Sequence, residues 1–133
     1  MKPKISFFAL ADTVITDKQN KNSLIGIFQT FNVSSVPTVL ASFAVFLRII
    51  GVSKAKEIEI KVTNQSGEIV ATQSYQNLQL KQDSINVATL FTNTKITTYG
   101  KYEVLVYVDK EKLDSGDEQF FTVIPKTNDT ANF

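Results

Sequence analysis

Apolar and polar residues alternate along most of this chain, and a period of two is typical of β-strands that bury one face. The alternation is clearest over Lys56–Val62, where isoleucine and valine fall on one face and charged residues on the other. A turn sequence ending in glycine follows at 64–67, and the chain returns as a second strand over Glu68–Tyr75. No segment has the pattern of an amphipathic helix. The pattern therefore predicts an all-β protein.

About eight strands are expected, at the spacing of a β-sandwich. They cover Lys4–Thr13, Ser23–Asn32, Ala41–Val52, Lys56–Val62, Glu68–Tyr75, Ser84–Phe91, Lys101–Asp109 and Glu118–Ile124. Phe43–Ile50 and Tyr102–Val108 are apolar on both faces, so each should be a central strand. We expect one antiparallel sandwich domain over residues 1–125 and a frayed polar tail over 126–133.

Two glycine-containing segments refine this fold. Gly26 lies inside an expected strand, which indicates a bulge or a close approach of the backbone. Gly100-Lys101-Tyr102 opens a β-branched strand and resembles the tyrosine corner of immunoglobulin-like sandwiches, although Val104 stands where such domains have their second cysteine. The fold expected is therefore an immunoglobulin-like antiparallel sandwich, and the role of Tyr102 is architectural.

Composition narrows the functions that fit. The 133 residues include no histidine and no cysteine, which removes the commonest general base, metal ligand and thiol nucleophile. The net charge is +1, and the basic residues are lysine except for Arg48, so nucleic acid is not expected as a partner. No phosphate-binding glycine motif occurs, and no apolar run is long enough to span a membrane. We expect no catalytic residue, metal or cofactor.

Arg48 is the candidate site residue. It lies in the middle of an apolar strand, on the same side as Phe46 and Ile50. Its charge needs an acid, carbonyl oxygens or water. Two interpretations stay open, namely an ion pair with Glu57 or Glu59 on a neighbouring strand, or an anchor for an acidic ligand or partner.

Two further segments have alternative interpretations. Asp109–Glu118 is the most acidic stretch, and its lysines favour a solvated hairpin tip over a calcium loop. The first residues combine two lysines with the short apolar run Ile5–Ala11, which favours a first strand over an export signal. We therefore expect a cytoplasmic protein.

Several short motifs occur in a fixed order along the chain. They are Ala11-Asp12, Asn22-Ser23-Leu24-Ile25-Gly26-Ile27-Phe28, Pro37, Val45-Phe46-Leu47-Arg48, Gly100-Lys101-Tyr102 and Phe121-Thr122-Val123. In this the chain resembles an uncharacterised bacterial family described only as a domain of unknown function. The resemblance covers most of residues 4–124 and implies an intracellular all-β sandwich. It brings no catalytic residue to this sequence.

Three functional hypotheses follow. The first is a non-enzymatic interaction or structural module that binds an unidentified protein, or a second copy of itself as a homodimer, through a sheet face or an edge strand. The second is a small-ligand or carbohydrate-binding module that uses Arg48, Tyr99 or the acidic loop. The third is a hydrolase that works without histidine, although no motif or residue spacing in the sequence points to one.

Overall fold

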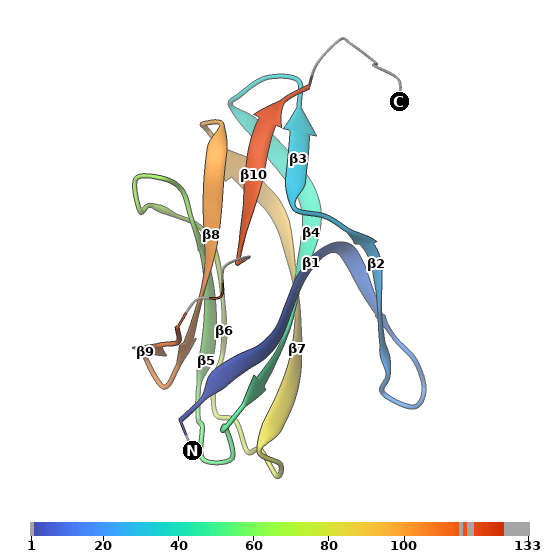
Figure 1. Ribbon diagram of the computed structural model, residues 1–133, viewed down its shortest axis with the longest axis vertical. Coiled ribbons are helices and arrows are strands. Elements are labelled where there is room, and N and C mark those ends of the chain that lie inside the picture. Colours follow the sequence, from blue (N-terminus) through green and yellow to red (C-terminus); the bar gives the residue numbers. More distant parts are fainter. Residues whose placement is uncertain (1, 115, 117–118, 127–133) are drawn as a thin grey trace.

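The computed structural model describes residues 2–114, 116 and 119–126, which form two β-sheets packed face to face (Figure 1). The strands are β1 (Lys4–Thr16), β2 (Asn22–Ile27), β3 (Thr30–Val33), β4 (Thr38–Ile50), β5 (Ile58–Thr63), β6 (Ile69–Tyr75), β7 (Ser84–Ile96), β8 (Gly100–Val108), β9 (Glu111–Lys112) and β10 (Phe120–Pro125). The four-stranded sheet has the order β2-β1-β4-β7, and the six-stranded sheet has the order β3-β10-β8-β5-β6, with β9 beside β8. Among these strands only β3 and β10 pair in parallel. The predicted all-β sandwich is confirmed.

The two strands that are apolar on both faces occupy central positions, as expected. β4 lies between β1 and β7, and its Val45, Leu47 and Ile49 point into the space between the sheets, where they are fully buried. β8 lies between β10 and β5 and contributes Tyr102 and Val104 to the same core. Burial of these side chains is the main contribution to stability.

The single strand expected over 23–32 is two strands in different sheets. β2 pairs with β1 in the four-stranded sheet, whereas β3 pairs with β10 in the six-stranded sheet. Phe28, just after β2, and Phe31, in β3, have ring centroids 4.3 Å apart. Both rings pack against Phe43 in the core. The chain crosses from one sheet to the other here because these two phenylalanines enter the core at the crossing.

A kink changes the face that β4 and β7 present to the core. Phe43 and Phe91 are paired and buried, and Leu40 and Thr94, three positions away, are also paired and buried. Regular alternation would place these two pairs on opposite faces of the sheet. Asn93 has a positive φ of 53° and lets the backbone make the change.

The strand glycine and the predicted tyrosine corner each have a structural explanation. Gly26 has a φ of +72°, and a Cβ atom there would overlap the side chain of Asp12 on β1, so a close approach does require glycine. The Tyr102 hydroxyl donates to the carbonyl oxygen of Thr98 at 2.7 Å, and the tyrosine ring stacks on Phe121. This is the backward hydrogen bond that a tyrosine corner predicts.

Candidate functional site

The outer face of the four-stranded sheet is unusual because its side chains are largely apolar. In an antiparallel pair, residues directly opposite each other project to the same side, so the strand register identifies this face. Its positions include Phe7, Ala9, Ala11, Thr13 and Ile15 in β1, Ile25 and Ile27 in β2, Ser42, Ala44, Phe46 and Arg48 in β4, and Asn86, Ala88, Leu90 and Thr92 in β7. We call this surface the outer face. The sheet is therefore apolar on both sides, although only one side meets the core.

Arg48 lies at one end of the outer face, between Phe7 on β1 and Asn86 on β7. Its Nε atom donates to the Asn86 side-chain oxygen at 3.0 Å, which orients the guanidinium group. Within the described residues the terminal nitrogens of Arg48 make no hydrogen bond or ion pair. Arg48 thus keeps an exposed charge that is free to bind an anion.

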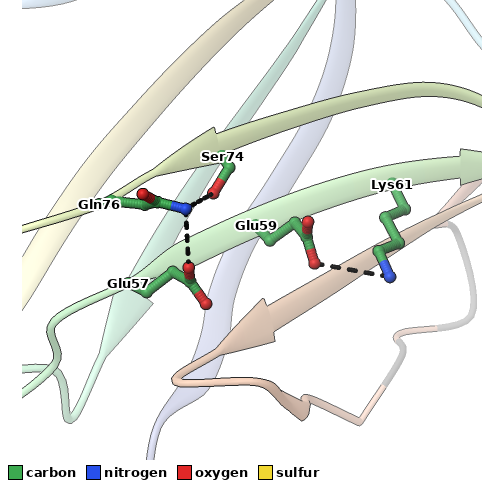
Figure 2. Close-up of polar contacts among 5 residues, drawn as sticks. All are labelled: Glu57, Glu59, Lys61, Ser74 and Gln76. Atoms are coloured by element: carbon green, nitrogen blue, oxygen red, sulfur yellow. Dashed lines mark hydrogen bonds and ion pairs between the residues drawn. The ribbon is translucent and has the colours of Figure 1, made fainter.

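The ion pair suggested for Arg48 is not formed. Glu59 lies in β5 of the six-stranded sheet and Glu57 immediately precedes that strand, and Figure 2 shows both engaged by other partners. Glu57 accepts a hydrogen bond from Gln76 at 3.1 Å, and Glu59 lies 3.5 Å from the ammonium group of Lys61. Glu57 and Glu59 therefore have their partners on the opposite side of the sandwich from Arg48. The reason is that β4 and β5 follow each other in sequence but enter different sheets.

The guanidinium group of Arg48 lines an open depression of about 400 Å³ together with Ser6, Phe7, Phe46 and Asn86. The rings of Phe7 and Phe46 meet edge to face, with centroids 5.8 Å apart. Phe7 is half exposed and forms the apolar side of the depression, whereas Arg48 and Asn86 form the polar side. We call this depression the Arg48 pocket. Its chemistry suits an anionic group attached to an apolar or flat body, and it holds no nucleophile paired with a base.

The other residues considered for ligand binding lie elsewhere. Tyr99 precedes β8 at the end of the sandwich where Thr38 pairs with Ile96, so roughly ten strand residues, or about 33 Å, separate it from Arg48. Its carbonyl oxygen accepts a hydrogen bond from the side chain of Gln65.

The acidic stretch is likewise separate from Arg48. The Asp109 carboxylate accepts hydrogen bonds from the backbone amides of Lys56 and Glu57, which is a structural role. Ser115, Asp117 and Glu118 of this stretch lie outside the described residues, as does 127–133 of the expected tail. Across the part of the chain that the structure covers, no three acidic side chains gather as they would around a metal ion.

Two neighbours of Arg48 could not be predicted from the sequence because they depend on the register between strands. The apolar neighbours of Arg48 on its own strand follow from alternation, but Phe7 and Asn86 become its neighbours only through the pairing of β4 with β1 and β7. A bulge between Ile5 and Phe7 shifts that pairing by one residue. No local pattern in the sequence specifies such a shift.

Comparisons with known proteins give a family and a fold. A family model described as "Family of unknown function (DUF6941)" matches residues 6–117, which is most of the chain. A search of curated proteins gives no match. The fold is similar to part of a Pseudomonas fluorescens alkylpurine DNA glycosylase, AlkC, solved bound to DNA containing an abasic site analog. The TM-score is 0.52 at 12% identity, and the match covers 91% of this chain but 30% of the glycosylase.

These results correct the expectation about partners. An unidentified protein or a second copy was expected, and nucleic acid was excluded, yet one similar solved structure, the glycosylase, has DNA as its bound partner. The exclusion rested on the net charge of the whole chain and on its single arginine, but the charge is unevenly distributed. The strands of the four-stranded sheet contain Lys4, Arg48 and Lys95 but only one acid, Asp12. None of the described segments is a helix long and apolar enough to cross a membrane.

Proposed function

The chain belongs to the DUF6941 family of unknown function, and we propose that it is a non-catalytic binding module whose Arg48 pocket takes an anionic group joined to an apolar body. The observation that carries the proposal is an exposed guanidinium group without an acidic partner beside an exposed aromatic ring. A charged group in an apolar setting is costly unless it is hydrated or meets an opposite charge. A ligand that brings an anion and buries Phe7 at the same time satisfies both groups.

The orientation of Arg48 supports an oxyanion ligand. Asn86 holds Nε, so the two terminal nitrogens face outward as a fork that matches two oxygens of a phosphate or carboxylate. Ser6, whose hydroxyl lies 3.5 Å from the Arg48 carbonyl oxygen, adds a second polar group at the rim. The DNA in the glycosylase structure is one carrier of such phosphates, and phosphate on a flexible carrier is the chemistry that we propose here.

The test is a titration of isotope-labelled protein with hexyl phosphate, inorganic phosphate and a short single-stranded thymidine oligonucleotide, followed by amide NMR shifts. We expect saturable shifts around Phe7, Phe46 and Arg48 with hexyl phosphate, and weaker ones with inorganic phosphate because it cannot cover Phe7. Saturation by the oligonucleotide at the same residues would identify nucleic acid as the phosphate source.

Two variants complete this test. Arg48→Gln removes the charge and should abolish the shifts, whereas Lys61→Gln removes a cation from the six-stranded sheet and should leave them unchanged. Binding that persists in Arg48→Gln, or no saturable binding of any probe, would contradict the proposed function.

We also infer that the sandwich is immunoglobulin-like. The tyrosine corner at Tyr102 and the parallel addition of β3 beside β10 support this assignment. The bacterial origin and the cytoplasmic location stay predictions from the sequence.

A further inference from the structure

We infer that the outer face binds an anionic lipid surface and that a lipid headgroup supplies the anion for the Arg48 pocket, an inference that rests on the proposed function of that pocket. It extends the site from one depression to a whole sheet face. Three observations carry it, namely the breadth of the apolar surface, the sign of its charges and the contrast with the opposite face of the sandwich.

The apolar surface is broad. Ile27 is 67% exposed on β2, Phe7 is 48% exposed on β1 and Leu90 is 55% exposed on β7, so large apolar side chains reach from one edge of the sheet to the other. Three strand spacings separate β2 from β7, which is about 14 Å. A single amphipathic helix presents a narrower apolar stripe than this. A lipid surface is wide enough to cover all four strands.

The charges of the outer face have one sign. Lys4 pairs with Ile50 and lies on the same side as Arg48 at one end, and Lys95 pairs with Val39 beyond the kink at the other end. The only acid in these four strands, Asp12, lies between Ala11 and Thr13 and therefore points to the other side. Long cationic side chains at both ends can reach headgroups while the aliphatic centre enters the interface.

The six-stranded sheet differs from the outer face in its charge. The strands of the six-stranded sheet balance three acids, Glu59, Glu103 and Glu111, against three lysines. Lys61 lies over the ring of Tyr107 and close to Glu59, and Lys101 lies over the ring of Phe120. Two of the three lysines of that sheet are thus engaged within the protein, and its acids balance its cations, whereas the outer face carries cations without any outward acid.

Other occupants fit the outer face less well. A nucleic-acid strand would lay phosphates against isoleucine and leucine, and Phe7 is the only large exposed aromatic on this face available for base stacking. A second copy of the chain would bring cations against cations in the absence of any outward acid. An anionic bilayer meets both the aliphatic and the cationic side chains.

The experiment is co-sedimentation of the full chain with vesicles of phosphatidylcholine alone or mixed with phosphatidylserine. We expect binding to the mixed vesicles only, weakened by salt, and weakened roughly fivefold for each of Lys4→Gln and Lys95→Gln. Ile27→Ser and Leu90→Ser should also weaken binding. The matched controls Lys112→Gln and Ile69→Ser change exposed residues of the six-stranded sheet and should bind like the parent protein.

The outcomes separate this inference from the proposed function. Saturable binding of hexyl phosphate at Arg48 without sedimentation on anionic vesicles would overturn the lipid inference and leave the pocket proposal standing. Equal binding to both kinds of vesicle, or equal losses in the control variants, would also overturn it. A single-stranded oligonucleotide that binds at Ile27 and Leu90 and thereby prevents sedimentation with the vesicles would also overturn it. A stable dimer that buries these two residues would do the same.

Discussion

Replacing Tyr102 by phenylalanine tests the most specific structural prediction of the sequence. The tyrosine is fully buried and its ring stacks on Phe121 with centroids 5.3 Å apart, and Tyr102→Phe keeps this packing. The change removes only the hydroxyl, which donates to the Thr98 carbonyl oxygen at 2.7 Å and lies 3.2 Å from the Thr98 hydroxyl. The substitution therefore isolates the hydrogen bond of the corner.

The expected loss follows from hydrogen-bond energetics. A hydrogen bond of this kind contributes about 0.5–1.5 kcal/mol net, and an acceptor left partly buried raises the cost toward 2 kcal/mol. We expect Tyr102→Phe to lower the free energy of unfolding by about 1–2 kcal/mol, which for a chain of this length shifts the melting temperature by roughly 4–7 °C. Urea unfolding followed by circular dichroism should show a lower midpoint and an unchanged slope.

Tyr99→Phe is the matched control. Tyr99 is 38% exposed, and within the described residues its hydroxyl has no hydrogen-bond partner, so its removal should change the unfolding free energy by less than about 0.5 kcal/mol. If Tyr102→Phe also falls within that range, the hydroxyl does not stabilise the corner and the reasoning is wrong. A changed slope would mean that the variant perturbs the unfolded or native ensemble instead.

Three further predictions concern stability. Phe43→Ala removes the ring at the centre of the phenylalanine cluster and should cost about 3–5 kcal/mol in urea unfolding; a loss under about 1 kcal/mol would show that the core collapses around the gap. Thr94→Val removes a buried hydroxyl that has no partner among the described residues, and calorimetry should find a gain of about 1 kcal/mol instead of a loss. Gly26→Ala should cost at least about 1 kcal/mol from its left-handed backbone, and a double-mutant cycle with Asp12→Ala should reduce that cost, since the overlap is with the Asp12 side chain.

The sequence predicts only the part of the candidate site that lies on β4. Alternation places Arg48 on the same side as Phe46, and that part of the Arg48 pocket follows from one strand. The acids nearest in sequence, at positions 57 and 59, suggested an ion pair because strands that follow each other usually lie together. Here β4 and β5 enter different sheets, so the pair is absent and Asn86 on β7 holds the guanidinium group instead.

The sequence by itself determined the local features of this protein: most of the strands, the alternation of their buried faces, the central place of β4 and the hydrogen bond of the tyrosine corner. Each depends on periodicity or on residues a few positions apart. Tertiary structure alone decided the division of residues 23–32 between two sheets, the kink at Asn93 and the apolar, cationic outer face. These features depend on strand order and register, which are set by pairing between residues far apart in the chain, and alternation within one strand cannot specify its neighbours.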